Sequence, residues 1–306
     1  MLSPIEEIIT DMADSDKPLL NSSLVGLSNI IPEDLNFLKE VWPTIKPERR
    51  RQIVSRLVEL TEGNFELDFD STFKNCLSGQ DAEVRSKAIE GLWENEEPSL
   101  IKKLIDLMEQ DNSKLVQATA ATGLGKFAML AEQQKLRPTY TSKIYQSLLA
   151  VVNDRIKPIE VKRRALEAIA PLDSPEVEKA IGEAYRSSNH RLRVSSIYAM
   201  GKNGNPSWLS ILLDEAGNPD PEIRYEVVRA CGELGEEEAV PYLIKLAADP
   251  DVEVQLAAIE TLGHIGGTEA KNFLEQCLDD PNETVQQATE QVLEDLLAEG
   301  EDSPPF

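Results

Sequence analysis

The sequence predicts an all-α solenoid, a superhelix of stacked helix-turn-helix units of about 31 residues. Between Asp220 and Ile265 one unit is written twice, and its aliphatic anchors Ile223 and Val254 lie 31 residues apart. The same unit recurs with its anchor at Val84, Val116, Val161, Leu192 and Val285. A fixed period of this length is typical of repeat proteins in which each unit buries its apolar face against its neighbours.

A helix is expected to begin just before each anchor. Six of the seven positions three residues upstream can cap a helix N-terminus with a side-chain oxygen. They are Asp81, Ser113, Asn189, Asp220, Asp251 and Asn282, and the seventh is Pro158.

The anchor, the fourth and the eighth residue after it form one apolar stripe on that helix. The fourth is mostly small, which lets a neighbouring helix approach closely. The fourth positions are Ala88, Ala120, Ala165, Ser196, Val227, Ala258 and Thr289, and the eighth are Leu92, Leu124, Ile169, Met200, Cys231, Leu262 and Leu293.

Glycines predict where this first helix ends. They occur nine residues after the anchor (Gly125, Gly201, Gly232, Gly263) and twelve after it (Gly204, Gly235, Gly266), and we expect both sets to mark the helix end and the turn. A second helix follows, with apolar residues near position twenty: Leu104, Ile181, Leu212, Leu243 and Leu274. No alternating pattern long enough for a strand is present.

This pattern resembles the HEAT-like repeats named after phycobilisome lyases, whose consensus has an Asp, a Val-Arg pair, a small residue and a closing Leu-Gly. Here Asp81, Val84-Arg85, Ala88 and Leu92 match it, as do Asp220, Ile223-Arg224 and Gly235. The resemblance implies the fold. It does not assign a function, because the family includes chromophore lyases, a metal-dependent hydroxylase, a DNA glycosylase relative and many adaptors.

The expected organisation has three parts. Residues 1–79 are predicted to form N-terminal capping helices and degenerate repeats, since a capped helix start occurs at Ser3 and Ile53 lies 31 residues before Val84. Residues 80–298 are the HEAT-like repeats. Residues 299–306 are predicted to be a disordered acidic tail. Trp42 and Trp93 are expected to be packing residues near helix ends rather than ligand contacts.

One interval, from Val116 to Val161, is 45 residues long and contains an insertion near 128–141. Insertions in solenoids can carry the binding function. The alternative is an extended helix and loop that bends the stack, and this second interpretation is favoured.

The chain is acidic, with a net charge of −24, and residues 203–306 hold 4 Lys and Arg against 24 Asp and Glu. Such a surface repels nucleic acid and favours a basic partner, although simple solubility explains it as well. The sequence shows no signal peptide and no long apolar run, and its three cysteines suit a reducing compartment. We therefore expect a cytoplasmic protein without a membrane association.

Residues 155–202 reverse the balance, with 10 basic against 6 acidic side chains. Projection of the first helices places a partner-binding groove at Lys126, Arg163, Arg164, Tyr198, Lys202, Tyr225 and Arg229. Tyrosine and arginine are enriched at interaction hot spots, although a solvated helix face is the simpler interpretation. The long donors that follow the anchors, among them Arg85, Lys162, Arg193 and Arg224, are expected to form a structural ladder to cap carboxylates and loop carbonyls.

The sequence offers no catalytic arrangement. Its two histidines, His190 and His264, are not followed by Glu, so the His-Glu pairs that hold iron in the HEAT-like hydroxylases are missing. No phosphate-binding glycine loop or nucleophile motif is present. We expect no catalytic residue, no metal and no cofactor.

Three functions remain open. The first is a non-catalytic scaffold that binds a protein or peptide on its first helices. The second is a chromophore-lyase-like protein that holds a bilin or another tetrapyrrole, as the repeat type implies. The third is nucleic-acid binding through a ridge from Arg163 to Arg193, which the total charge opposes.

Overall fold

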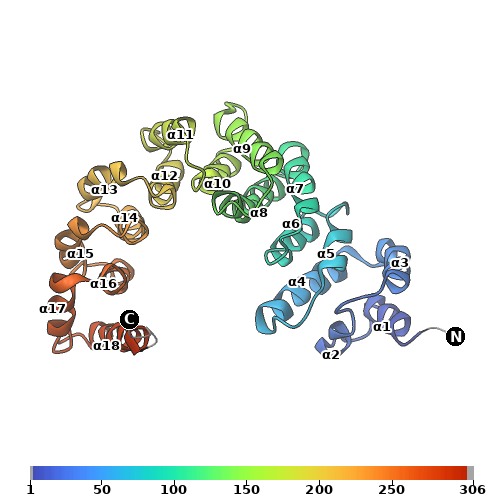
Figure 1. Cartoon of the computed structure of the whole chain (residues 1–306). Helices are drawn as coiled ribbons and strands as arrows, with labels where there is room; N and C mark the ends of the chain where they lie inside the picture. Colours follow the sequence, from blue (N-terminus) through green and yellow to red (C-terminus); the bar gives the residue numbers. More distant parts are fainter. Residues whose placement is uncertain (1–2, 302–306) are drawn as a thin grey trace. The chain divides into compact units, whose positions relative to one another are not determined.

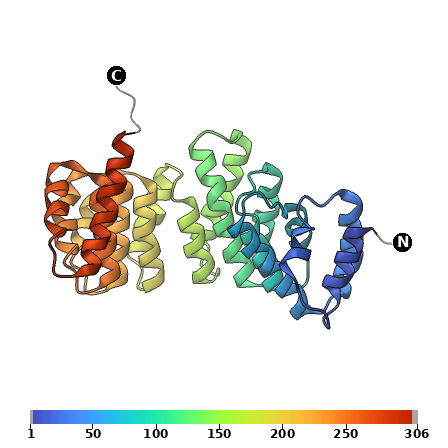
Figure 2. The same cartoon turned by 90° about the horizontal axis from the view of Figure 1, so that it is seen from below.

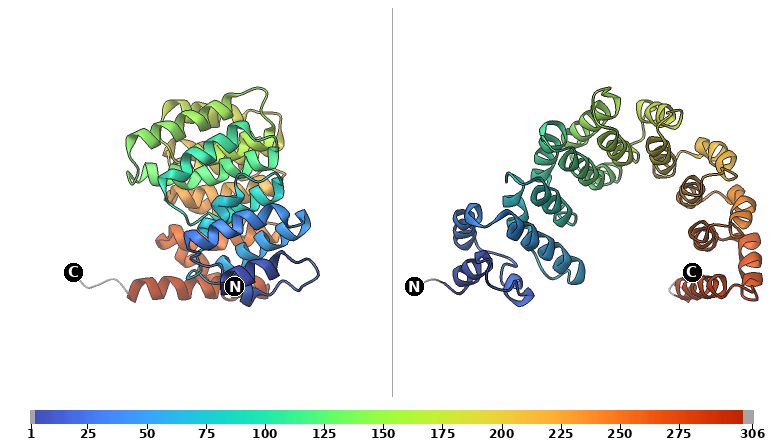
Figure 3. Two further views of the ribbon diagram at one scale, coloured as in Figure 1. Left: turned by 90° about the vertical axis from the view of Figure 1, so that its right-hand side faces the viewer. Right: turned by 180° about the vertical axis from the view of Figure 1, so that it is seen from behind.

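The structure, a computed structural model, describes residues 3–301, and among these residues it contains only helices and no strands. The chain forms two compact units, the first ending at Ala168 and the second beginning at Ile169. Each unit is a double layer of antiparallel helices, as the views in Figures 1 and 3 show. The prediction of an all-α solenoid is confirmed.

The first unit begins with a capping helix. The Ser3 hydroxyl accepts from the Glu6 amide and the Ser3 amide donates to the Glu6 carboxylate, which is a complete capping box. In the layers that follow, α4 packs on α6, α6 on α8, and α7 on both α8 and α9. The helices of this unit are α1 Pro4–Ala13, α2 Asn21–Val25, α3 Pro32–Val41, α4 Pro47–Gly63, α5 Asp70–Cys76, α6 Ala82–Gly91, α7 Pro98–Gln110, α8 Lys114–Glu132, α9 Pro138–Asn153 and α10 Ile159–Ile169, with a 3-10 turn η1 Trp42–Thr44.

The second unit is the more regular. Its first helices α12, α14, α16 and α18 pack successively on one another, and each is covered by a second helix. Figure 2 shows these first helices side by side, in yellow to red. The helices are α11 Pro175–Tyr185, α12 His190–Asn203, α13 Leu209–Glu215, α14 Pro221–Leu234, α15 Val240–Leu246, α16 Val252–Ile265, α17 Gly267–Cys277 and α18 Glu283–Glu301, with 3-10 turns η2 Pro206–Trp208 and η3 Glu237–Ala239.

The predicted apolar stripe is the core of the stack. All seven anchors are buried, as are all seven residues four positions later and the five apolar residues of the second helices. At the eighth position only Leu293, in the last repeat, is half-exposed. Its exposure follows from its place, because no further helix stacks on α18 within the described residues.

Five of the predicted caps make the expected hydrogen bonds. Asp81, Asn189, Asp220, Asp251 and Asn282 each accept from a backbone N–H in the first turn. Ser113 does not; its own amide donates instead to Asp111, 2.8 Å away. The helix starts were therefore predicted correctly, although the Ser113 side chain makes no capping hydrogen bond.

The two glycine sets have different roles, which corrects the sequence interpretation. Gly204 and Gly235 end α12 and α14 with φ of +69° and +68°, a conformation that other residues adopt at a cost. Gly201, by contrast, lies inside α12, where a Cβ would be 2.7 Å from the Ala230 Cα of α14. The glycine nine residues after the anchor is thus a packing glycine, which lets successive first helices touch.

The insertion lengthens two helices rather than forming a separate loop. α8 has 19 residues and α9 has 16, whereas α14 and α15 have 14 and 7. Phe127, Ala128, Leu130 and Ala131, which lie in the added part of α8, are buried. The extra residues therefore lengthen α8 and α9 and add to the core.

The expected tail at 299–306 overlaps the last helix. The backbone of residues 299–301 belongs to α18, and residues 302–306 lie outside the described part of the chain. At the other end, Trp42 is buried as a packing residue, but Trp93 is 49% exposed. This second tryptophan therefore needs another explanation.

Candidate protein-binding surfaces

Two of the four arginine or lysine residues predicted to form a ladder, Arg85 and Arg224, do clamp a loop. Arg224 donates to both carboxylate oxygens of Asp249 at 2.7 Å and to the Asn218 carbonyl. Arg85 repeats this geometry with Asp111 and the carbonyls of Gly79 and Gln80. Each arginine therefore fastens the start of a first helix to the segment leading into the next repeat.

The other two ladder positions differ. Arg193 donates to Glu215, which also accepts from the Tyr185 hydroxyl and from the side-chain amide of Asn218. Lys162 makes no ion pair or side-chain hydrogen bond among the described residues. In that repeat Lys157 acts instead, because its amine donates to the carbonyls of Met108 and Glu109.

The clamp makes a prediction for stability against pH. Burial would raise the pKa of the Asp249 carboxyl, but hydrogen bonds from Arg224 and the Asp251 amide, with the Arg224 charge, together hold the pKa below its ordinary value. A carboxyl whose pKa is lower in the folded state stabilises the fold fully at pH values above its unfolded pKa, which is about 4 for Asp. This stabilisation is lost as the pH falls through the lower pKa of the folded state.

We therefore expect the difference in unfolding free energy between the wild type and Asp249→Asn to be widest above about pH 4 and to narrow in more acidic solution. Urea titrations at a series of pH values measure this difference. The control is Asp279→Asn, at an exposed position without an ion pair among the described residues. A difference that stays constant with pH would show that the Asp249 charge does not contribute.

The predicted groove residues of the first unit are already engaged. Arg163 is held by Glu160 and Glu167 at 2.7 and 3.2 Å, and Arg164 pairs with the same two carboxylates. The Lys126 amine donates to the Trp93 carbonyl at 2.6 Å. Glu94 and Glu96 also lie 3.8 Å from the Lys126 amine. Because all three cations have carboxylates beside them, they offer little unbalanced positive charge to a nucleic acid.

The groove residues of the second unit lie on two neighbouring helices. Tyr198 and Lys202 are one turn apart on α12, with the amine 6.0 Å from the ring centre, and Tyr225 and Arg229 repeat this pair on α14 at 5.9 Å. Lys202 also pairs with Glu233 of α14. Since α12 packs on α14, the structure brings these four predicted residues onto one helix layer.

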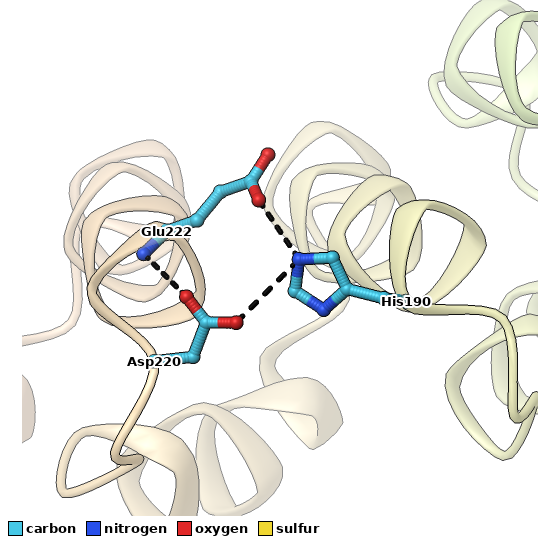
Figure 4. Close-up of side chains that lie close together, drawn as sticks. All are labelled: His190, Asp220 and Glu222. Atoms are coloured by element: carbon cyan, nitrogen blue, oxygen red, sulfur yellow. Dashed lines mark hydrogen bonds and ion pairs between the residues drawn. The ribbon is translucent and has the colours of Figure 1, made fainter.

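A polar cluster that sequence reasoning missed lies at the starts of α12 and α14 (Figure 4). The His190 Nε2 atom is 2.8 Å from Glu222 and 3.5 Å from Asp220, and Asp220 also caps the Glu222 amide. Three potential metal-ligand atoms lie within 4.8 Å of one another. Negative charge is also favourable at the N-terminus of α14, where both carboxylates lie. Because His190 belongs to α12, its hydrogen bond to Glu222 joins two successive repeats. The spacing of 32 residues between His190 and Glu222 is close to the repeat period and could have revealed it.

The first unit contains a cleft of about 680 Å³ that the sequence did not reveal. It lies between the end of α4, the loop that follows it and the loop after α6. Phe65 and Trp93 line it, and both are exposed. An exposed aromatic pair at a concave surface marks this region as a second candidate binding site.

The three cysteines are buried, and burial raises the pKa of each thiol. Burial raises the pKa of the Cys76 thiol and of the Cys231 thiol to about 12, so both stay protonated at neutral pH. No helix among residues 3–301 has the length and apolar character needed to cross a bilayer.

Comparison with known families decides the classification. A model of HEAT repeats matches residues 71–153 and 208–294, which is more than half of the chain. The chain is a HEAT-repeat protein. The two matched segments fall in the first and the second unit, and the unmatched stretch between them contains α10, α11 and α12.

Solved structures show the same fold in distant proteins. A chain from the complex of CpcE and CpcF of phycocyanin lyase from Nostoc sp. PCC7120 is 13% identical, with a TM-score of 0.52, covering 93% of this chain and 97% of that one. A chain of the Kap95:Nup1 complex is also 13% identical, with a TM-score of 0.53, covering 96% of this chain and 46% of that one. At this identity the likeness shows the fold alone. No curated protein sequence matches the chain.

Proposed function

We propose that this HEAT-repeat protein is a non-catalytic scaffold that binds a partner protein on α12 and α14, through Tyr198, Lys202, Tyr225 and Arg229. The observation that supports this is the repeated tyrosine–cation pair on two adjacent first helices. Tyrosine and arginine contribute much of the energy at protein interfaces.

The paired geometry favours binding. A cation that already rests near a tyrosine ring loses less side-chain freedom when a partner arrives. Lys202 is further held by Glu233. The surface therefore offers aromatic area in a largely fixed arrangement, which lowers the entropic cost of association.

The comparisons agree with this class of function. Solenoids expose long helix layers that serve as binding surfaces. The two similar chains come from structures of complexes, CpcE with CpcF and Kap95 with Nup1. These names describe those proteins, and the partner of this chain has to be found by experiment.

The test uses a photo-crosslinking amino acid, p-benzoylphenylalanine, at position 198 or 225 of the full chain in its source cells. The matched control is position 242, because Tyr242 of the second helix α15 also pairs with a lysine, Lys245, at 5.2 Å. We expect a protein that crosslinks at 198 and 225 but not at 242. That protein, purified, should bind Tyr198→Ala/Tyr225→Ala at least about tenfold more weakly than wild type, with Tyr242→Ala unchanged. Equal crosslinking at all three positions, or equal affinity for all variants, would disprove the assignment.

A further inference from the structure

The cleft of the first unit has walls that are aromatic and acidic. Its lining includes Phe65, which is 96% exposed, and Trp93, which is 49% exposed. Full exposure of a phenylalanine is unfavourable in water, because its apolar surface gains by burial. A partner that covers this ring would remove that surface from solvent.

The same cleft carries a concentration of negative charge. Five carboxylates line it, and no lysine or arginine does; the five are Glu62, Asp68, Asp70, Glu90 and Glu94. Nearby lysines offset three of them, at Asp70, Glu90 and Glu94. Glu62 and Asp68 make no ion pair among the described residues. A cation entering the cleft therefore meets carboxylates that are not neutralised.

The two aromatic residues stand on loops that are held in place. The loop of Phe65 is fixed at its end by Asp68, whose amide donates to the Ser28 hydroxyl and whose carbonyl accepts from the Asn29 amide at 2.7 Å. The loop of Trp93 is fixed by the Lys126 amine on its carbonyl. Preorganised loops lose less freedom when a ligand binds.

Two lining residues of the cleft, Phe69 and Gly91, pack against the core residue Phe73. Phe69 and Phe73 are buried and meet edge to face, with ring centres 6.3 Å apart. Gly91 faces the Phe73 ring so closely that an added Cβ would overlap it. One side of the cleft is therefore formed by the folded core.

Burial of Asp70 also fits this site. Burial raises the pKa of the Asp70 carboxyl; the Asn95 hydrogen bond opposes the rise, and the charge of Asp68 adds to it. The repulsion between the Asp68 and Asp70 carboxylates produces part of this rise in pKa, and a cation bound between them would reduce that repulsion.

We propose that this cleft binds a basic, leucine- or aromatic-containing segment of a partner protein. Arginine or lysine side chains would meet Glu62 and Asp68, and the apolar side chains would cover Phe65 and Trp93. The occupant is a polypeptide because the carboxylates are spread from the end of α4 to the loop after α6 and because Phe65 exposes nearly its whole ring, so a chain with several spaced cations and apolar side chains between them fits best. The site belongs to the first unit and does not depend on the proposed surface at α12 and α14.

The probe is an acetylated and amidated octapeptide of alternating arginine and leucine, titrated into the full chain by calorimetry and by tryptophan fluorescence. Trp93 should report binding, since Trp42 and Trp208 are buried, and the signal should vanish in Trp93→Phe. We expect affinity to fall steeply between about 50 and 500 mM salt, because screening shortens the range of charge attraction. Octapeptides with glutamate for arginine, or serine for leucine, should bind at least about tenfold more weakly.

Variants locate the site. Phe65→Ser and Glu62→Gln/Asp68→Asn should each lower affinity about tenfold, whereas Glu237→Gln/Glu238→Gln, which removes the same charge from the acidic second unit, should change it less than about twofold. Far-UV circular dichroism should stay unchanged, since Phe65 is exposed and the side-chain oxygen left by Asp68→Asn can still accept from the Asp70 amide. Equal affinity across these variants, or tight binding of the arginine–serine peptide, would overturn the proposal. Tyr198→Ala/Tyr225→Ala should bind the octapeptide normally, so failure of either proposal can be told from failure of the other.

Discussion

Replacing Arg224 by methionine is expected to lower the free energy of unfolding of the second unit by about 3 kcal/mol, the lower end of the range for breaking a buried ion pair. Methionine keeps most of the apolar stem but removes the donors to Asp249 and to the Asn218 carbonyl. The side chain of Asp249 is only 5% exposed. Its charge would then remain buried beside a single backbone donor, the Asp251 amide.

Hydrogen exchange of the α14 and α15 amides in the full chain measures this loss locally, which suits a repeat protein whose unfolding need not be a single transition. Arg229→Met is the matched control on the same helix, because Arg229 is exposed and contacts Tyr225 at 3.3 Å. Adding Asp249→Leu to Arg224→Met should recover part of the stability by removing the uncompensated charge. An Arg224→Met protein as well protected as Arg229→Met would show that the clamp contributes little.

Replacing Gly201 by alanine should destabilise the second unit by about 2 kcal/mol, within the usual range for overpacking a core. In an exposed helix the change would stabilise by about 1 kcal/mol, because alanine favours the helix. Here the added methyl would meet the Cα of Ala230, a backbone atom that can move only if α12 and α14 separate. Steric overlap therefore outweighs helix propensity.

The control is Gly217→Ala, since nothing lies within 4 Å of a Cβ at Gly217. Urea unfolding followed by Trp208 fluorescence measures both variants; Trp208 is the tryptophan of the second unit. We expect the midpoint to fall for Gly201→Ala and to stay or rise slightly for Gly217→Ala. A stabilised Gly201→Ala protein would mean that α12 and α14 are less closely packed than the structure shows.

Much of the fold could be predicted because its signals are local and repeated. The cap, the anchor and the small residue four positions later recur with one period, so each copy supports the assignment of the others. The glycine nine residues after the anchor was misread for a related reason. Glycine serves both where a helix ends and where two helices touch, and only the neighbouring Ala230 shows which applies to Gly201.

The candidate sites were less predictable. Projection placed Tyr198, Lys202, Tyr225 and Arg229 on one helix layer. It overlooked that Arg163 pairs with Glu160 and Glu167, although residues three and four apart are neighbours on a helix surface. Trp93 was predicted to be a packing residue. Its position near a helix end is compatible with a buried and with an exposed side chain, so the sequence could not distinguish them. The cleft beside it depends on a loop fixed by Ser28 and Asn29, about 40 residues earlier in the chain.

The sequence by itself determined the repeat, the helix starts, the buried stripe and hence the solenoid, because these depend on residues within one period of each other. The tertiary structure decided which charged side chains are already neutralised and which aromatic rings reach solvent. Pairs such as Arg224 with Asp249, and the exposure of Trp93, depend on the distance between groups far apart in sequence, and a pattern of residue types does not contain that distance.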